Sequence, residues 1–327
     1  MKHKFNYKTT KVQQMIDITL DAIASEKYKE GENLPSINAL KSKYNVSRDT
    51  IFKAFLELKA RGVIDSVPGK GYFVASAQKS VLLLLDEYSP FKEAFYNTLN
   101  SKIQQSHKID LWFHQYNERF FNEIVQNSVG KYNKYIIMNY HNEKFSDILS
   151  KIDKKRLLLL DFGKFDKSEY YYLCQDFDKA FTDALQTIID DLRKYTELVF
   201  VMNKEHQHPR SSTEFFNRFC AKNNLTCEII DEIGPDFSIK KNAFYIIIKQ
   251  TDLVKIIKAG KNGLLKPGID YGILAYNENP FYEVIENGIS SIGIDWEEMG
   301  EKAAKFVLQE KPLRMYLPTK IIKRDSF

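Results

Sequence analysis

A short polar segment near the N-terminus carries residue types that suit contacts with nucleic acid. The first residues of one predicted helix are Ser47, Arg48, Asp49 and Thr50. An arginine guanidinium can meet guanine O6 and N7 with two hydrogen bonds, and serine and threonine suit phosphate or base contacts. Asp49 has two possible roles. Its negative charge can be stabilised by the dipole at the N-terminus of its helix, or its carboxylate can accept a hydrogen bond from a cytosine amino group, and we prefer the first role. Arg48 is therefore the strongest candidate for base readout.

Phosphate contacts are expected from residues on either side of this segment. Ser36 begins another predicted helix, whose first backbone N–H groups can bind a phosphate. Lys41 and Lys53 supply positive charge on the same helices. The turn Gly69–Gly71 places Lys70 between two glycines, which allow a close approach to the minor groove.

Three helices and a hairpin are predicted to position these side chains. The expected elements are helices over residues 11–25, 36–44 and 47–61 and strands over residues 63–67 and 72–75. Ser36 and Ser47 can cap the second and third helices. This order forms a winged helix-turn-helix, whose second motif helix enters the major groove. We therefore predict a DNA-binding domain over residues 1–78.

Four motifs in this region resemble the GntR family of bacterial regulators. They are Gly31–Ser36, Tyr44–Thr50, Leu58–Val63 and Gly69–Val74, in the family's order and spacing. The resemblance implies sequence-specific binding to operator DNA. Two positions depart from the family pattern, since Asn38 and Phe52 stand where it usually has arginine. We expect a changed operator sequence rather than a loss of binding.

The charge of the chain is concentrated in the same region. Residues 1–78 contain 13 Lys and Arg against 8 Asp and Glu, so they carry the whole of the chain's net charge of +5. Residues 79–327 are neutral overall. Concentrated positive charge suits a polyanion such as DNA, although a solvated basic surface gives the same count.

Beyond residue 79 the pattern changes to alternating strands and helices. Aliphatic runs such as Val81–Leu85 and Leu157–Leu160 have strand length, and amphipathic segments separate them. The predicted helices include one around residues 144–152 and a long one over 178–194. Such alternation predicts parallel sheets with helices on both faces. The expected fold class is α/β with an α+β head, and residues 79–327 should form two lobes.

This part resembles the effector-binding domain of LacI–GalR regulators, which share the fold of type I periplasmic sugar-binding proteins. The matching segments are Leu83–Phe91, Asp176–Asp178, Ile292–Ala304, and Leu317–Thr319 with Arg324–Ser326 as a closing strand. The resemblance implies a carbohydrate effector between the lobes and a dimerisation role. Lys249, Gln250 and Asn277 replace the family's usual residues, so a standard pentose or hexose does not follow.

Side chains at predicted strand ends are the candidates for the effector site, because parallel sheets bind ligands at the carboxyl ends of their strands. Sugars need planar hydrogen-bonding groups for their hydroxyls and aromatic rings for their C–H faces. The candidates are Asp86, Tyr88, Phe91, Asp176, His208, Arg210, Lys249, Gln250, Asp252, Asn277 and Glu278. Phe91 can equally pack on its own helix. Asp178 is better interpreted as a helix N-cap than as a ligand contact.

Several other classes of protein are disfavoured. The three cysteines, Cys174, Cys220 and Cys227, form no C-x-x-C pair and are expected as buried thiols in a reducing cytosol. The N-terminus lacks an apolar signal-peptide core and no apolar run could span a bilayer, so we expect a soluble cytoplasmic protein. The close pair His206 and His208 lacks a carboxylate at metal spacing, so no metal is expected.

We expect a transcriptional regulator, specifically a repressor, that binds double-stranded operator DNA as a homodimer and responds to a small-molecule effector. No cofactor or catalytic activity is expected, since the sequence holds no G-x-S-x-G or P-loop motif. Two alternatives stay open: a GntR-type head fused to a pyridoxal-phosphate enzyme, and a small-molecule-binding protein without a regulatory role.

Overall fold

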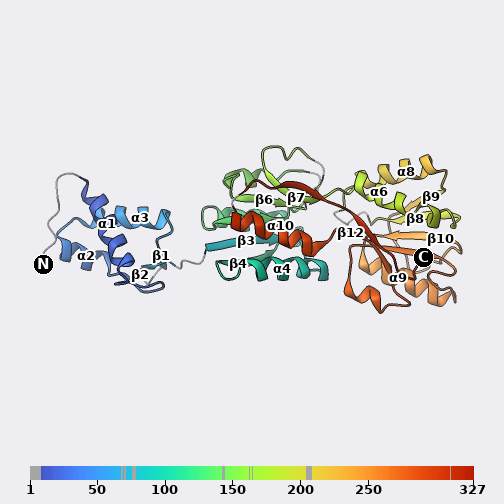
Figure 1. Ribbon diagram of the computed structural model, residues 1–327, viewed down its shortest axis with the longest axis horizontal. Helices are drawn as coiled ribbons and strands as arrows, with labels where there is room; N and C mark the ends of the chain where they lie inside the picture. The colour runs from blue at the N-terminus through green and yellow to red at the C-terminus, as the bar shows by residue number, and fades with distance from the viewer. Residues whose placement is uncertain are drawn as a thin grey trace. The chain divides into compact units, whose positions relative to one another are not determined.

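The computed structural model describes the chain apart from residues 1–8, 68, 70, 76–78, 142–143, 162, 164, 204–207 and 310. The chain divides into two compact units, residues 1–79, which we call the head, and residues 80–327, which we call the two-lobed unit. Figure 1 follows the chain from the head in blue to the last strand of the two-lobed unit in red.

The head is a winged helix-turn-helix, as predicted. It consists of α1 (Lys11–Ala24), α2 (Ile37–Tyr44), α3 (Arg48–Ala60) and an antiparallel hairpin of β1 (Ile64–Val67) and β2 (Gly71–Val74). Thr10, Ser36 and Ser47 cap the three helices, each accepting a hydrogen bond from the backbone N–H three residues on. The buried side chains of α1 and α3 share one apolar core with the hairpin. Every predicted element ends within one residue of its observed bounds.

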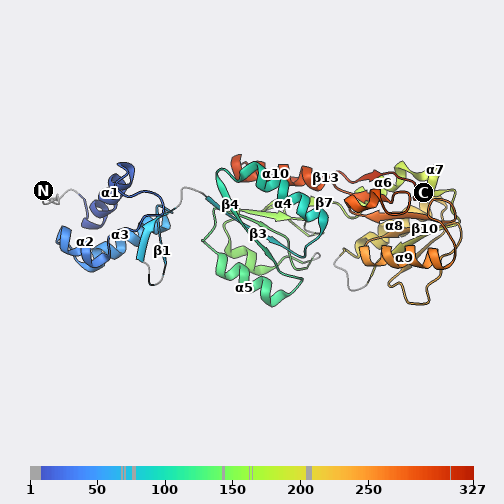
Figure 2. The same cartoon turned by 90° about the horizontal axis from the view of Figure 1, so that it is seen from below.

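The first lobe is a six-stranded sheet between two layers of helices. Its strands lie in the order β13 (Arg314–Leu317), β7 (Tyr171–Gln175), β6 (Leu157–Leu160), β5 (Lys134–Ile137), β3 (Lys79–Leu85) and β4 (His107–Phe113). Figure 2 shows α4 (Pro90–Ile103) and α10 (Trp296–Gln309) on one face and α5 (Glu118–Ser128) on the other. Because helices cover both faces, β5 and β6 are buried along their whole length.

The second lobe repeats this arrangement. Its strands lie in the order β14 (Lys320–Ile322), β12 (Ser290–Gly293), β11 (Gly272–Tyr276), β10 (Ala243–Ile247), β8 (Glu197–Val201) and β9 (Cys227–Ile230). The helices are α6 (Lys179–Thr187), α7 (Ile189–Leu192) and α8 (Ser211–Asn223) on one face and α9 (Gln250–Asn262) on the other, with the 3-10 turn η2 (Pro280–Glu283). The edge strand β14 runs antiparallel to β12.

The chain passes between the lobes three times, after β7, after β12 and after β13. Because β7 and β12 lead directly into the other lobe, the carboxyl edge of each parallel sheet faces the other lobe. This is the edge at which parallel sheets bind ligands. Among the described helices, none combines the length and apolar character needed to cross a membrane.

Three predicted segments differ from the structure. The helix predicted over residues 178–194 is two helices, α6 and α7, because Ile188 leaves the helical conformation at φ −115° and ψ 22°. The helix predicted around 144–152 is a shorter 3-10 helix, η1 (Asp147–Lys151). The predicted closing strand is two strands in different lobes, since β13 stops before Pro318, which has no backbone N–H to continue the ladder. Residues 324–326 lie beyond β14 and are not a strand.

The close crossing of α4 and α10 predicts a stability effect at Gly300. A Cβ atom there would lie 2.8 Å from the backbone O of Phe95 and 2.9 Å from Thr98 Cβ. We expect Gly300→Ala to lower the free energy of unfolding by about 1–3 kcal/mol, as in other overpacked cores. Urea unfolding followed by tryptophan fluorescence measures this, because both tryptophans, Trp112 and Trp296, lie in the two-lobed unit.

Gly263→Ala is the matched control. The nearest atom to a Cβ at Gly263 is 3.5 Å away, which is an ordinary contact. Its backbone φ of −84° suits alanine, so this variant should unfold within about 1 kcal/mol of the parent protein. Equal destabilisation of both variants would contradict the close α4–α10 contact.

Candidate functional site

The head presents Arg48 at the exposed start of α3. Ser47 Oγ accepts from the Thr50 backbone N at 3.0 Å and lies 2.7 Å from Thr50 Oγ1, so both hydroxyls hold the helix start together. Arg48 is exposed and forms no ion pair with the described residues. Its guanidinium donors are therefore open to a ligand. Ser36 is also a cap, since its Oγ accepts from Ala39 N at 3.2 Å.

Two of the predicted DNA-contact residues neutralise each other. Lys53 Nζ lies 2.9 Å from Asp49 Oδ2, one helical turn away. Both side chains are well exposed, so this pair is weak and can open to a phosphate. Asp49 also stands in the first turn of α3, where the helix dipole favours a negative charge. Lys41 is exposed on α2.

The turn between β1 and β2 requires glycine. Gly69 and Gly71 have φ values of +81° and +90°, which residues with a Cβ rarely adopt. Lys70, the predicted minor-groove contact, lies outside the described residues.

Asp86 is the centre of a buried polar cluster at the end of β3. Its carboxylate forms an ion pair with Lys92 of α4 and accepts a hydrogen bond from Tyr116 Oη at 2.9 Å. The Lys92 and Asp86 side chains are only 7% and 15% exposed. Burial lowers the pKa of the neighbouring His114 to about 4, so its imidazole is neutral at pH 7.

A chain of hydrogen bonds continues from the first lobe into the second. Gln175 Nε2 donates to Asp161 Oδ2 at 2.8 Å, and Tyr276 Oη donates to Gln175 Oε1 at 3.0 Å. Asp161 follows β6 and Gln175 ends β7, whereas Tyr276 ends β11 of the second lobe. Burial raises the pKa of Asp161 to about 6, and the charge of Asp86 adds to this effect. The two sheets therefore meet at a buried polar contact.

Most members of this cluster are not among the candidates predicted from the sequence, namely Lys92, Tyr116, Asp161, Gln175 and Tyr276. Asp161 directly follows the predicted strand Leu157–Leu160, so the strand-end rule that selected Asp86 could have found it. Gln175 and Tyr276 are the last residues of β7 and β11, so they too stand at strand ends. Nothing in the sequence singles out Lys92 from the other lysines.

Phe91 and Asn277 both contact Trp296. The Phe91 and Trp296 ring centroids are 4.8 Å apart, and Trp296 Nε1 donates to Asn277 Oδ1 at 3.2 Å. Phe91 and Trp296 line a pocket of about 330 Å³ between α4, β12 and β14, which also includes Glu278. Tyr88 is exposed, and its hydroxyl donates to Glu93.

Asp176 and Asp178 lie where β7 leads into α6. Asp176 Oδ1 accepts from the backbone N of Asp178 at 2.9 Å and of Lys179 at 3.1 Å, so Asp176 supplies the capping oxygen. Asp178 holds the N-cap position but accepts from Ser211 Oγ of α8 at 2.7 Å instead. A pocket of about 230 Å³ lies here, and its lining residues are Gly163, Gln175, Asp176, Phe177, Asp178, Pro209, Ser211 and Tyr316.

His208 and Arg210 flank this pocket without lining it. The buried His208 ring lies 5.0 Å from the rings of Phe177 and Tyr276, and its Nε2 lies 3.0 Å from Ser212 Oγ. His208 therefore packs in the aromatic core of the second lobe. Arg210 Nη1 lies 3.6 Å from Asp231 Oδ1, so its charge is partly neutralised.

Lys249, Gln250 and Asp252 form the start of α9. Asp252 is buried and pairs with Lys255 at 3.4 Å, and Gln250 Nε2 is buried without a hydrogen-bond partner among the described residues. No described contact joins these residues to the Asp86 cluster. Glu278, another predicted effector contact, accepts a hydrogen bond from Arg324 Nη2 at 2.7 Å.

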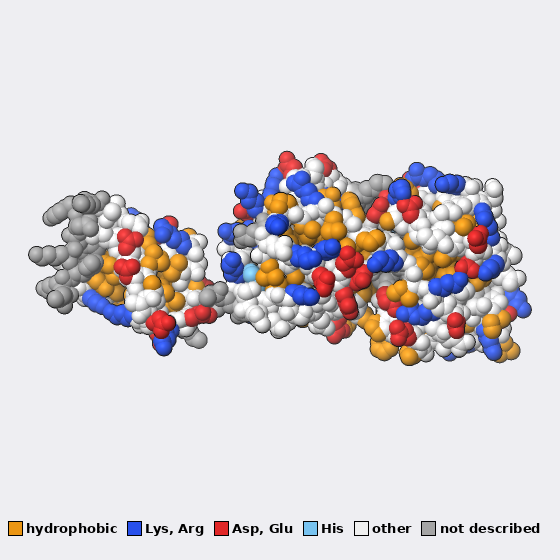
Figure 3. Space-filling model, in the orientation of Figure 1, with side chains coloured by type: hydrophobic (Ala, Val, Ile, Leu, Met, Phe, Trp, Pro, Cys, Tyr) orange, Lys and Arg blue, Asp and Glu red, His pale blue; other side chains and the backbone are white. Residues whose placement is uncertain are grey.

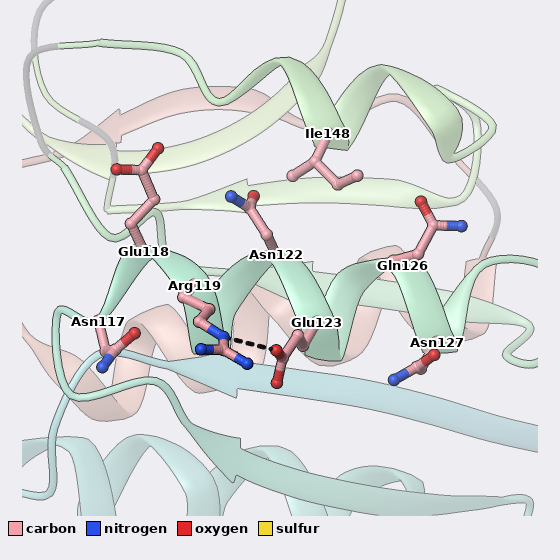
Figure 4. Close-up of a pocket in the computed structure, with 8 residues that line it drawn as sticks. All are labelled: Asn117, Glu118, Arg119, Asn122, Glu123, Gln126, Asn127 and Ile148. Atoms are coloured by element: carbon pink, nitrogen blue, oxygen red, sulfur yellow. Dashed lines mark hydrogen bonds and ion pairs between the residues drawn. The ribbon is translucent and has the colours of Figure 1, made fainter.

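A third hollow lies over the outer face of α5. Figure 4 shows that its lining side chains, apart from Ile148, come from α5 and the residue before it, and that Arg119 and Glu123 pair with each other. One helix surface with self-paired charges provides no converging set of polar groups. We therefore assign no function to this hollow.

The raised pKa of Asp161 predicts a pH dependence of stability. Between pH 4 and 6 folded Asp161 keeps a proton that the unfolded chain has already released, so unfolding releases a proton. Stability from this group therefore falls as pH rises from about 4 to about 6 and stays low above. Asp161→Asn removes this pH-dependent contribution to stability. The variant should gain stability relative to the parent protein on going from pH 4.5 to 7.5, by at most about 3 kcal/mol at about 1.4 kcal/mol per pKa unit.

Urea unfolding followed by tryptophan fluorescence at several pH values measures the difference between the two proteins. Contributions from groups outside the cluster, and most of that from His114, cancel in this difference. A difference that stays constant between pH 4.5 and 7.5 would contradict the burial of Asp161 as an acid.

The sequence of the head matches a known family. Residues 11–74 match the family described as "Bacterial regulatory proteins, gntR family". The head is therefore a GntR-type domain. The "Uncharacterized HTH-type transcriptional regulator YurK" of Bacillus subtilis is 40% identical over 82 residues, which are 25% of this chain and 34% of that protein. The "Probable fructoselysine utilization operon transcriptional repressor" of Escherichia coli is 42% identical over 73 residues, 22% of this chain and 30% of that protein.

The chain covers between 13% and 52% of the length of these curated relatives and four others. The likeness therefore concerns only part of this chain and part of each relative.

About three quarters of the chain resembles several solved structures in its fold. The trehalose repressor from Escherichia coli has a TM-score of 0.59 at 13% identity, covering 76% of this chain and 100% of that one. A LacI family transcriptional regulator from Arthrobacter, in complex with lactose, has a TM-score of 0.61 at 14% identity, covering 76% and 99%. An uncharacterized protein from Actinobacillus succinogenes has a TM-score of 0.64 at 14% identity, covering 77% and 99%.

Proposed function

We propose that this protein is a cytoplasmic transcriptional repressor that binds operator DNA through its head and a carbohydrate between its two lobes. This function is supported by the combination of two parts in one chain. A GntR-type head exposes Arg48 at the start of α3, and a two-lobed fold places a polar cluster at its facing sheet edges.

The DNA-binding role rests on the head. The second helix of a helix-turn-helix enters the major groove with its first residues toward the base edges. Arg48 stands at that position with open guanidinium donors. The head carries the chain's excess positive charge, which supplies the salt-dependent part of the affinity.

The effector role rests on the facing edges of the two sheets. Carboxylate, amide and hydroxyl groups of Asp176, Gln175 and Ser211 line the 230 Å³ pocket together with the aromatic rings of Phe177 and Tyr316. This mixture suits the hydroxyl groups and C–H faces of a sugar. The Arthrobacter relative in fold is described in complex with lactose, which supports a carbohydrate of some kind.

Regulation would follow from a change in lobe geometry. A ligand that bridges both lobes competes with or reinforces the Tyr276–Gln175 hydrogen bond and so biases the lobes toward one arrangement. In a homodimer this shifts the two heads relative to the half-sites of a palindromic operator. On this account the protein acts by binding and has no catalytic step.

Two assays on the full-length protein test the proposal. Selection from random DNA should enrich a palindromic sequence, bound with an affinity that falls steeply with salt. A thermal-shift screen of monosaccharides, disaccharides and sugar acids should reveal a ligand, since 100 times the dissociation constant stabilises by about 2.7 kcal/mol. Failure to enrich any sequence would contradict the DNA-binding role.

A further inference from the structure

The outward face of α3 carries an apolar line beside its charged residues. Phe52 is 42% exposed and Leu56 is 48% exposed, although both are large apolar side chains. The inward face of the same helix is fixed by four fully buried residues, which are Ile51, Ala54, Phe55 and Leu58. Phe52 and Leu56 therefore point away from the core of the head and are not required to hold it together.

The exposed residues of α3 form two parallel rows. Arg48, Phe52 and Leu56 are spaced four residues apart, so they follow one another along one line of the helix surface. The adjacent row contains two ion pairs, Asp49–Lys53 at 2.9 Å and Glu57–Arg61 at 3.0 Å, in which each charge is balanced by its neighbour. In the line that starts at Arg48, by contrast, the positive charge has no ion-pair partner among the described residues, and two apolar side chains follow it. Figure 3 shows apolar atoms lying among basic and acidic side chains on the surface of the head.

We propose that Phe52 reads the C5-methyl group of a thymine in the major groove, next to the base that Arg48 reads. The proposal rests on the DNA-binding role proposed above. The thymine methyl is the apolar group that a base pair presents in the major groove, and an apolar side chain is the group that recognises it. Phe52 lies one turn, about 6 Å, along α3 from Arg48, whereas base pairs rise by about 3.4 Å. The operator should therefore hold a thymine about two base pairs from the guanine contacted by Arg48.

Other occupants of this line fit the surroundings less well. A protein partner or a second head would leave the Arg48 guanidinium desolvated beside an apolar contact, which is costly unless the partner supplies an anion. The major groove of DNA supplies partners for both the cation and the apolar side chain, because guanine presents hydrogen-bond acceptors and thymine presents a methyl group on the same groove floor. The positive charge and the apolar surface on this line therefore together fit major-groove DNA.

The test replaces thymine by uracil, one position at a time, in the operator selected by the full-length protein. Uracil lacks only the C5-methyl group. The parent protein should lose affinity about four-fold at one thymine per half-site, the factor that corresponds to burying one methyl-sized group. Phe52→Ala should bind the thymine and uracil versions of that position equally well, because the contact is already gone.

Two further variants make the result specific. Phe52→Arg should select guanine at the same position, since its guanidinium can make the two hydrogen bonds that phenylalanine cannot. Leu56→Ala, the matched control, removes an equally exposed apolar side chain one turn farther on and should keep the uracil profile of the parent protein.

Three outcomes would overturn the inference while leaving DNA binding itself intact. The uracil scan could show no sensitive thymine near the guanine. Phe52→Ala could keep the same sensitivity as the parent protein. Phe52→Ala could change the sedimentation of the DNA-free protein, which would assign this line to self-association. Failure to select any operator would instead contradict the DNA-binding role on which the inference rests.

Discussion

Lys92→Met should lower the free energy of unfolding of the two-lobed unit by about 3 kcal/mol, the usual cost of leaving one partner of a buried ion pair alone. Lys92 Nζ pairs with Asp86, and neither side chain reaches water appreciably. Without Lys92, the Asp86 carboxylate faces a second acid, Asp161, whose pKa its charge already raises. Methionine keeps an unbranched side chain and is shorter by only the terminal heavy atom, so most of the loss reports the charge rather than a cavity.

A double variant tests whether the unpaired Asp86 charge causes this loss. Lys92→Met combined with Asp86→Asn removes both charges and should regain most of the lost stability, because no buried charge is then left unpaired. Lys179→Met is the control at an exposed pair, since Lys179 and Asp183 are 74% and 61% exposed. It should change stability by less than about 1 kcal/mol. Chemical denaturation followed by Trp112 and Trp296 fluorescence gives all three values. Similar losses for Lys92→Met and Lys179→Met would contradict the buried cluster.

Arg48→Ala should weaken operator binding by a factor of about 5 to 150, which corresponds to about 1–3 kcal/mol for one bidentate contact with guanine. Binding to random DNA should weaken much less, since that affinity comes from charge on the phosphates. Because Arg48 is exposed at the start of α3, its replacement should leave the fold intact, and a folding defect would not explain such a loss. Fluorescence anisotropy with operator and random duplexes measures the ratio.

Arg48→Lys tests the geometry of the contact, because lysine keeps the charge but lacks the planar fork. It should recover binding to random DNA but not the preference for the operator. Lys41→Ala serves as the comparison for a phosphate contact and should lower both affinities by a similar factor, with a shallower salt dependence. If Arg48→Ala lowered both affinities equally, Arg48 would be a phosphate contact and base readout would lie elsewhere.

The head could be predicted closely because its signals are local. Capping serines, helical periodicity and a glycine turn each act within a few residues, and all five predicted elements end within one residue of the observed bounds. The long predicted helix beyond Asp178 failed for the opposite reason. The helix breaks at Ile188, where neither proline nor glycine marks the break in the sequence. We attribute the break to packing, because α6 and α7 each bury side chains against the sheet of the second lobe.

The polar cluster between the lobes could be predicted only in part. The strand-end rule found Asp86, because a single strand and its polar end residue are visible in the sequence. Lys92 became part of the site through burial against Asp86, and Tyr276 through a contact with Gln175, a residue 101 positions away. Such pairings depend on how two sheets face each other. His208, selected by its place after a strand, packs among aromatic rings instead.

In the mechanism proposed here, one ligand between the lobes controls DNA binding by the head. The most direct measurement is the affinity of the full-length protein for its selected operator, with and without a saturating concentration of the carbohydrate found by thermal shift. The ligand should weaken operator binding by a factor of about 5 to 150, the usual range of coupling between two sites. Random DNA should be bound equally in both conditions. An operator affinity that stays unchanged at saturating ligand would show that the ligand does not control DNA binding by the head.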